Sequence, residues 1–460
     1  MITVDSLGSS AFKREHGLRY AYVQGSMVRG IASARMVVAM GRAGFLGFLG
    51  TGARSVEAVE SAILEIKAGL AEGQPWGVNL LANAATPQAE MAAVDLLLRH
   101  DVPRIEASAY LQVTAPLVKY RAKGLRRGPG GRILFDRLVM AKLSRPEVAA
   151  QFLAPAPERL VAALLADGAI TAEEAELVRA VPMADDLCVE ADSGGHTDRG
   201  SLPSLLPPML QLRDELAARH GHPKPVRIGA AGGIGTPAAA AAAFVLGADF
   251  VLTGSINQCT VEADTSEAVK DLLQQIDVQD TGHCPSGSLF ELGAEIQVVK
   301  KGLFFPARAS KLYDLWRLHG SLDEIDARTR RQIQEKYFRR SFEAVWDETR
   351  SFYAEVAPEE IARAEANPKH KMALIFRWYF VHSMRLAEQG DTEQKVDYQI
   401  HCGPALGAFN HWVKGSGLED WRKRHVAEIA LRLMEATAAL LEERFAALSA
   451  PAPAAAASDA

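Results

Sequence analysis

The chain has 460 residues, of which 48% are hydrophobic, and a formal net charge of −5 at pH 7. A chain of this length builds two or three domain-sized parts, or one large barrel with an extension. The mild negative charge argues against nucleic acid as the main partner. The four cysteines lie far apart, and the spacing of His401, Cys402 and His411 matches no metal-binding pattern, so we predict neither a metal site nor a disulfide framework.

The sequence also argues against a membrane partner. No segment holds about 18 uninterrupted apolar residues, and the first residues lack the apolar run of a signal peptide. We therefore expect a cytoplasmic protein.

Strand-like and helix-like segments alternate from residue 20 to residue 258. This alternation is typical of parallel βαβ units. Eight such units predict an α/β fold with a closed (β/α)8 barrel, or TIM barrel, and a doubly wound open sheet is the alternative. The expected strands are Tyr20–Gln24, Phe45–Leu49, Trp76–Leu80, Arg104–Ala107, Leu138–Leu143, Leu187–Ala191, Val226–Ala230 and Phe250–Thr253. The expected helices are Ser33–Ala43, Ser55–Ala71, Thr86–His100, Ala115–Lys123, Arg145–Phe152, Ser204–His220 and Ala238–Leu246.

Two segments fall outside the eight units. Residues 153–183 form an insertion with helical character between the fifth and sixth units, and residues 280–448 predict a long, mostly helical extension rich in aromatic residues. The barrel is therefore expected over residues 15–279. Residues 449–460 are dominated by alanine and proline, which predicts a disordered tail.

Glycine-containing loops follow the last two expected strands. Gly232 and Gly233 follow the seventh strand, and Gly254 and Ser255 follow the eighth. Glycine lets backbone N–H groups approach a phosphate closely, and a following helix adds the positive end of its dipole. Paired loops of this kind hold phosphate groups in (β/α)8 barrels. The alternative is that Gly232 and Gly233 form only a tight turn.

Further candidate site residues lie at or just after the ends of three other expected strands. Residues 189–199 read VEADSGGHTDR, where Gly194 and Gly195 would let a flat ligand lie against bare backbone and His196 would act as a general acid. The alternative is a histidine that only bonds within its loop. Asn79 would serve a ligand or a loop backbone, and Met27 would pack on an aromatic ring or in the core.

Together these segments resemble the nitronate monooxygenase (2-nitropropane dioxygenase)-like FMN barrels. The resemblance rests on GSMVRGIASARMVVAMGRAGFLGFLG, WGVNL, AKLSRPEVA, VEADSGGHTD, AAGGIGTP and LTGSINQ. Within this family, the chain resembles the PfaD-type enoyl reductases, which act in trans on polyketide and polyunsaturated fatty acid synthases. The closer resemblance rests on EADSGGHTD, the inserted PAPERL, and the C-terminal KGLFFPARASKLYDLW, KMALIFRWYF and DYQIHCGPALGAFN, with His401 as a departure from an expected apolar residue.

The resemblance implies FMN as cofactor, NADPH as reductant, and an enoyl thioester on an acyl carrier protein as substrate. It implies that hydride passes through the flavin to the enoyl β-carbon, with His196 in the position of the active-site histidine. The flavin-binding residues that it implies are Gly25, Ser26, Met27, Asn79, Gly194, Gly195, Gly232, Gly233, Gly254 and Ser255, of which the last four hold the phosphate.

The sequence also indicates a partner protein, and it leaves alternative functions open. Lys300, Lys301, Arg308 and Lys311 would meet an acidic carrier protein, unless they are only a solvated charge run. The alternative functions are a nitronate monooxygenase-like flavin oxidase and a non-catalytic scaffold in a synthase. A barrel like that of inosine phosphate dehydrogenase is disfavoured, because no nucleophilic cysteine follows the sixth strand. Homodimer formation stays open.

Overall fold

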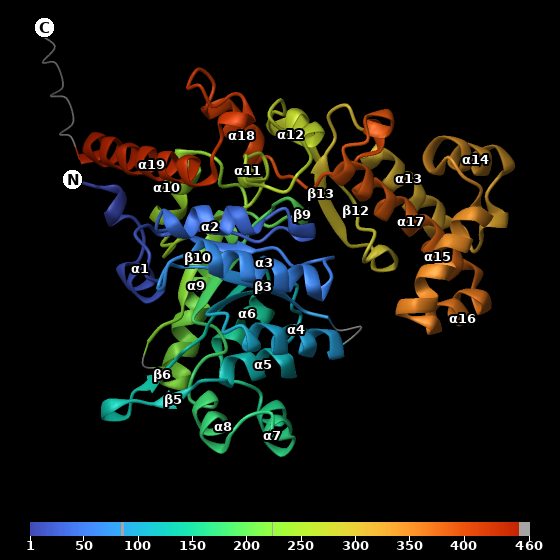
Figure 1. Cartoon of the computed structure of the whole chain (residues 1–460). Helices are drawn as coiled ribbons and strands as arrows, with labels where there is room; N and C mark the ends of the chain where they lie inside the picture. The colour runs from blue at the N-terminus through green and yellow to red at the C-terminus, as the bar shows by residue number, and fades with distance from the viewer. Residues whose placement is uncertain (84–86, 223, 450–460) are drawn as a thin grey trace, which may run out of the picture. The chain divides into compact units, whose positions relative to one another are not determined.

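The computed structural model describes residues 1–83, 87–222 and 224–449 (Figure 1). The chain divides into two compact units. The first comprises Met1–Val189, Leu202–Thr253 and the described residues from His425 onward, and the second comprises Glu190–Ser201 and Gly254–Arg424. This division differs from the boundaries expected from the sequence, which placed one break at residue 280. Residues 449–460, the expected tail, lie outside the described residues except for Ser449.

The first unit is built on a closed barrel of eight parallel strands, in the spatial order β1-β11-β10-β8-β7-β4-β3-β2. The barrel and each of the eight strands predicted from the sequence are confirmed. The strands are β1 (Tyr22–Gln24), β2 (Leu46–Leu49), β3 (Gly77–Leu81), β4 (Arg104–Ser108), β7 (Leu138–Leu143), β8 (Asp186–Glu190), β10 (Arg227–Ala231) and β11 (Val251–Thr253).

Seven predicted helices alternate with these strands. Several begin at serine or threonine caps; the side chains of Ser33, Ser55 and Thr236 each accept a hydrogen bond from a backbone N–H in the first turn. Thr86, the first residue of the expected helix Thr86–His100, lies outside the described residues. The helices are α2 (Ala34–Arg42), α3 (Val56–Gly69), α4 (Pro87–Arg99), α5 (Ala115–Ala122), α6 (Pro146–Leu153), α9 (Leu202–His220) and α10 (Pro237–Val245).

Three further parts of the first unit lie outside the barrel repeat. The insertion forms α7 (Glu158–Ala166) and α8 (Ala172–Val178), and the short hairpin β5 (Arg126–Arg127) and β6 (Ile133–Leu134) precedes β7. The last helix, α19 (Val426–Ser449), packs against α10. No helix among the described residues is long and apolar enough to cross a membrane.

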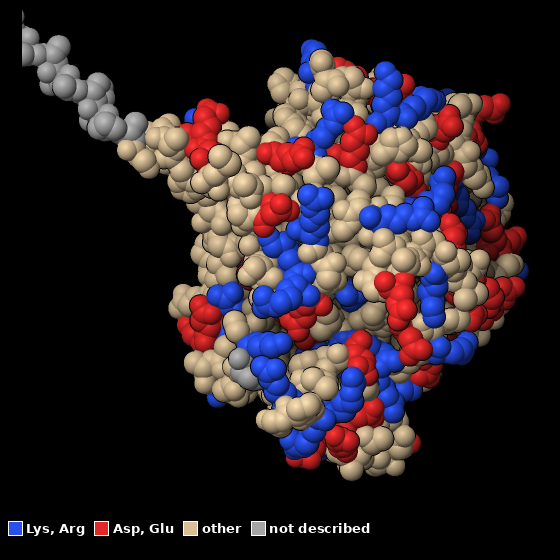
Figure 2. All heavy atoms as spheres, turned by 60° about the vertical axis from the view of Figure 1, so that its left-hand side comes forward, with Lys and Arg blue, Asp and Glu red and all other residues tan. Residues whose placement is uncertain are grey.

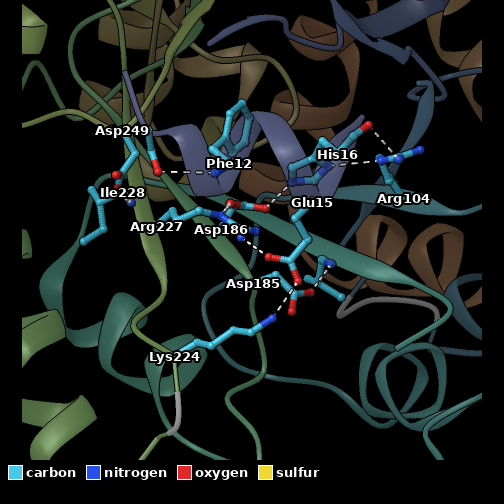
Figure 3. A network of polar contacts seen from close by, with 12 residues as sticks. Phe12, Glu15, His16, Arg104, Asp185, Asp186, Lys224, Arg227, Ile228 and Asp249 are labelled. Carbon is cyan, nitrogen blue, oxygen red and sulfur yellow. Dashed lines mark hydrogen bonds and ion pairs between the residues drawn. The ribbon is translucent and has the colours of Figure 1, made fainter. Parts of the chain in front are cut away.

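The barrel interior is filled by an apolar layer from alternate strand positions, including Val23, Phe48, Met140 and Leu252. Below this layer, α1 (Ser10–His16) closes the N-terminal end of the barrel (Figure 3). The ring of Phe12 stacks on Phe250 with centroids 4.2 Å apart. The apolar layer therefore separates this end from the mouth, where the parallel strands end.

A buried ionic network joins α1 to the strands. His16 Nε2 lies 2.6 Å from Asp186 Oδ2, and Arg227 Nε donates to Asp186 Oδ1 at 2.5 Å. Arg104 Nε donates to His16 Nδ1 at 3.0 Å, and Arg227 also pairs with Glu15. Burial opposes the charge of Asp186, but His16 and Arg227 outweigh it and lower the pKa of this carboxyl from 3.8 to about 2.

Asp186→Ala is expected to lower the free energy of unfolding by about 3–5 kcal/mol, because the buried Arg227 keeps only Glu15 as a partner and the buried His16 Nε2 loses its carboxylate. The folded pKa lies below the unfolded value, so the contribution of Asp186 is present above pH 3.8 and is lost as the pH falls towards 2. Urea denaturation at neutral pH measures the loss. The exposed pair Arg127–Glu176 provides the control, and Glu176→Ala should cost less than about 1 kcal/mol. Equal losses would contradict this role.

The second unit combines a small antiparallel sheet with helices. The sheet, in the order β12-β13-β9, was not predicted from the sequence; its strands are β12 (Thr281–Pro285), β13 (Glu295–Val299) and β9 (Gly195–His196). An aromatic core that includes Phe305, Phe338, Phe376 and Tyr379 packs the helices together. The helices are α11 (Ser255–Gln258), α12 (Glu267–Leu273), α13 (Phe305–Leu318), α14 (Ala327–Gln332), α15 (Phe342–Val356), α16 (Pro358–Ala366), α17 (Pro368–Gln389) and α18 (Ala405–Trp412).

On the face of the molecule that Figure 2 draws, the charged side chains are mixed in sign. Figure 2 shows basic and acidic side chains interspersed over one face of the molecule. Such a surface lacks the single-sign field expected of a nucleic-acid-binding face.

Candidate active site

A buried carboxylate marks the mouth of the barrel. Glu106 lies in β4 with no exposed surface and accepts hydrogen bonds from the Ser26 hydroxyl and, at 3.3 Å, from Asn79 Nδ2. Lys142 Nζ, from β7, lies 3.8 Å from Glu106 Oε2. Asn79 and Glu106 are the central residues of β3 and β4, Lys142 is next to last in β7, and Ser26 lies in the loop that follows β1. The arrangement is a compact polar cluster at the end of the barrel where TIM-barrel enzymes carry their chemistry.

Asn79 is occupied by protein partners. Its Nδ2 donates to Glu106 O at 2.9 Å and to Ser108 Oγ at 3.0 Å, and its Oδ1 lies 3.4 Å from the Thr51 hydroxyl. The sequence left open a ligand or a loop backbone as the partner of Asn79; in the structure its Nδ2 bonds to the neighbouring strand β4 instead, and the ligand role stays a prediction. Asn79 also positions Glu106, because the two side chains share a hydrogen bond.

Two of the predicted phosphate-binding glycines have open space where a side chain would stand. A Cβ on Gly233 would meet no atom within 4 Å, and the same holds for Gly254. Gly232 and Gly233 also have φ of +85° and +73°, the left-handed region that favours glycine. The positive φ alone favours glycine at Gly233, whereas Gly254 has φ of −125° and open space, so neither packing nor backbone conformation requires glycine there and close approach of a ligand to the backbone would. The open loop at Gly232 and Gly233, followed by the helix α10, fits the phosphate of FMN.

At Gly25, close packing explains why the residue is glycine. A Cβ on Gly25 would lie 2.5 Å from Leu252 Cδ2, and a Cβ on Gly50 would lie 1.8 Å from the carbonyl oxygen of Met27. Gly25 therefore allows a close contact inside the barrel. Met27 is half-buried, and its backbone is held against the loop after β2.

Gly194 and Gly195 have different roles within the second unit. A Cβ on Gly194 would lie 2.8 Å from Cys402 Cα, so this glycine permits close packing of the two chain segments. Gly195 has φ of +89° and begins β9, where it is paired with Gln297 of β13. Packing thus accounts for Gly194 without the flat ligand predicted from the sequence. Ser255, at the start of α11, accepts a hydrogen bond from Gly403 N at 3.0 Å.

His196 is held by two serine hydroxyls. Its Nε2 lies 2.8 Å from Ser286 Oγ and 3.0 Å from Ser288 Oγ. Desolvation lowers the pKa of the imidazole below 6.5, and the nearby charge of Glu190 offsets this only in part. The ring is therefore neutral near pH 7, and its N–H remains available as a hydrogen-bond donor.

A second histidine lies in the same sheet and was missed by sequence reasoning. His283 Nε2, on β12, lies 3.2 Å from Asp192 Oδ1, and the same carboxylate accepts from Thr197 Oγ1 at 2.6 Å and Gln297 Nε2 at 3.0 Å. Asp192 therefore positions His283, and no local motif around His283 indicated this contact.

The structure brings the predicted residues together in two sets. Ser26 and Asn79 converge on Glu106 at the barrel mouth, while Gly195 and His196 form β9 of the second unit and Gly194 directly precedes this strand. Glu106 and Lys142 were not predicted, although a charge inside the apolar strands RIEAS and LVMAKL would have indicated them. Within the described ranges, no three His, Cys, Asp or Glu side chains form a group that could hold a metal ion.

The description of the nitronate monooxygenase family matches residues 10–283. The chain belongs to this family, which consists of flavin-dependent oxidoreductases. Residues 319–398 match a second description, the inserted helical domain of [acyl-carrier-protein] S-malonyltransferase.

The chain is also similar to two named proteins and to one solved structure. The chain is 57% identical to the polyketide biosynthesis protein PksE of Bacillus subtilis over 96% of this chain and 57% of PksE. It is 41% identical to one component of the polyunsaturated fatty acid synthase of a Thraustochytrium species, over 91% of this chain and 28% of that component. The crystal structure of the enoyl reductase domain of MlnA, from the macrolactin cluster of Bacillus amyloliquefaciens, superposes with a TM-score of 0.93 at 46% identity, covering 96% of this chain and 100% of that domain.

These matches confirm the resemblance to synthase-associated enoyl reductases that the sequence motifs indicated. The chain spans 57% or less of the length of these two curated relatives.

Proposed function

We propose that the chain is an FMN-dependent enoyl reductase that uses NADPH to reduce the α,β-double bond of enoyl thioesters on acyl carrier proteins, acting in trans in polyketide or polyunsaturated fatty acid synthesis in the cytoplasm. The observation that carries this proposal is the match to the enoyl reductase domain of MlnA over almost the whole chain. The match to a domain of an acyl-carrier-protein transferase supports a carrier-bound substrate.

The barrel mouth fits the cofactor. Gly232 and Gly233 would hold the FMN phosphate through their backbone N–H groups, as would Gly254 at the end of β11. Bound FMN would supply hydride transfer from NADPH to the enoyl β-carbon. Ser26 and Asn79 hold Glu106 in place, and Lys142 beside it brings a cation to the mouth, where negative charge on a bound ring would be stabilised.

His196 is proposed to deliver a proton to the enoyl α-carbon or to polarise the thioester carbonyl. Ser286 and Ser288 fix the position of its Nε2. The lowered pKa makes the neutral ring the predominant form near pH 7. Proton delivery would therefore use the minor imidazolium form, whereas polarising the carbonyl requires only the N–H of the neutral ring. Gly195 allows the backbone turn that leads into His196, and no other residue type adopts φ of +89° readily.

The test uses the purified chain and its absorption spectrum. We expect bands of a bound flavin that bleach rapidly with NADPH in the absence of oxygen, and that return when a crotonyl carrier protein is added. Bleaching only by a nitronate would indicate the flavin oxidase instead. A colourless protein that reduces no enoyl thioester in the presence of added FMN would indicate a scaffold.

A further inference from the structure

A strongly basic segment lies on the surface of the second unit. Residues 326–340 contain six basic and two acidic residues. Arg330 pairs with Asp323, and Arg340 pairs with Glu348 and covers the ring of Trp378. The other four basic side chains are exposed and form no ion pair within the described part of the chain; they are Arg328, Arg331, Lys336 and Arg339.

A π-helical segment lies among these cations. The helix α14 (Ala327–Gln332), which holds Arg328 and Arg331, continues into the π-helical segment Ile333–Phe338, whose backbone hydrogen bonds join residues five apart. The buried pair Ile333 and Phe338 shows this spacing on the inner side. Arg331 and Lys336 have the same spacing and are exposed, and Arg328 precedes Arg331 by three residues, close to one α-helical turn.

The end of the π-helix adds the fourth cation. Arg339 follows Phe338 in the left-handed region with φ of +53°, which is uncommon for a residue with a side chain. π-Helical segments are rare and are found frequently at functional sites. Arg328, Arg331, Lys336 and Arg339 are called the α14 face below.

Two of the four basic residues that the sequence predicted to meet a carrier protein, Lys301 and Arg308, are already paired within the chain. Arg308 is paired with the buried Asp397 and lies between the rings of Phe304 and Tyr337. Lys301 Nζ lies 2.9 Å from Asp280 Oδ2. Only Lys300 and Lys311 of that group remain exposed and unpaired in the described chain, which corrects the hypothesis that all four meet a carrier protein.

We propose that the α14 face docks the acidic surface of the acyl carrier protein that presents the enoyl group. This inference rests on the proposed function. Charge complementarity carries it, because four exposed cations that form no ion pair among the described residues can pair with a partner's carboxylates at little desolvation cost. The match to the acyl-carrier-protein transferase domain over residues 319–398 includes all four cations.

The test compares two substrates in the full-length, flavin-loaded chain. The double variant Arg328→Glu/Arg331→Glu should raise KM for a crotonyl carrier protein on the order of 10-fold or more, because like charges then oppose docking. The kcat and KM for crotonyl-pantetheine, which lacks the carrier protein, should stay unchanged. The dependence of the carrier-protein reaction on ionic strength should also weaken, since fewer attractive charges remain to be screened.

Lys300→Glu/Lys311→Glu is the matched control, because it makes the same change in net charge at two exposed lysines of the same unit. It should change KM for the carrier protein by less than about 2-fold, the range expected of charges outside the interface. An unchanged KM in Arg328→Glu/Arg331→Glu, or an equal rise in the control, would overturn the proposal.

Fluorescence anisotropy with a labelled holo-carrier protein separates this proposal from the proposed function. A chain that reduces neither substrate would refute enoyl reduction, and the binding measurement would still decide the docking face. Loss of binding only in Arg328→Glu/Arg331→Glu supports the α14 face; equal binding of both variants overturns it.

Discussion

Gly233→Val is expected to yield a folded chain that carries no flavin. Gly233 has φ of +73° and open space around the position of a Cβ, so valine would fill the region through which a phosphate reaches the backbone N–H groups. A β-branched residue in the left-handed region also costs about 1–3 kcal/mol. The flavin content after gel filtration, measured as the ratio of flavin to protein absorbance, reports the loss.

Gly168→Val separates loss of the phosphate site from backbone strain. Gly168 follows α7 in the insertion, has φ of +67° and, like Gly233, has no atom within 4 Å of a Cβ position. The two variants should therefore lose similar stability in urea denaturation, while only Gly233→Val loses the flavin. Full flavin occupancy in Gly233→Val would show that the phosphate is bound elsewhere.

The barrel could be predicted because its determinants are local. Apolar runs bounded by glycine or proline gave the strands, and one of them, Leu138–Leu143, has the predicted limits. Caps such as Thr236 act within one turn of a helix, so the residues that start a helix are visible in its own sequence. The glycines that follow the strands could be predicted for the same reason, because each lies next to its strand in the sequence.

The second unit could not be predicted in the same way, because its sheet depends on distant pairing. His196 on β9 is paired with Ile296 of β13, 100 residues later in the chain. The close contact of Gly194 with Cys402 likewise depends on the tertiary fold. A glycine pair after a strand therefore fits both a ligand and a packing contact, and the sequence alone does not separate the two.

The same limit applies to charges. Arg308 belongs to a basic run in the sequence, yet its guanidinium is bound to Asp397, which follows 89 residues later. Glu106 reads as one charge in a short apolar strand, and its partners Ser26, Asn79 and Lys142 come from other strands and from the loop after β1. Whether a charged residue is an exposed contact or a buried partner is decided by tertiary structure.

His196→Ala is expected to slow the reduction of the enoyl thioester on the order of 10²–10⁴-fold, the usual effect of losing a proton donor. Reduction of the flavin by NADPH should remain near normal, and so should the flavin content, because the glycine loops are untouched. Stopped-flow absorbance measures the two half-reactions separately. The pKa of His196 is lowered, so the imidazolium form becomes scarcer as the pH rises through the range around its pKa. A wild-type rate that falls over this range would indicate proton delivery by imidazolium, and a rate that does not fall would indicate carbonyl polarisation by the neutral ring.

His283→Ala provides the comparison, because it removes the other histidine of the same sheet. His283 is held by Asp192, whereas His196 is held by Ser286 and Ser288, so each variant leaves the partners of the other intact. If His196 is the donor, His283→Ala should slow the enoyl step far less than His196→Ala. The reverse order would transfer the role to the Asp192–His283 pair, and an unchanged enoyl step in both variants would place the proton donor outside this sheet.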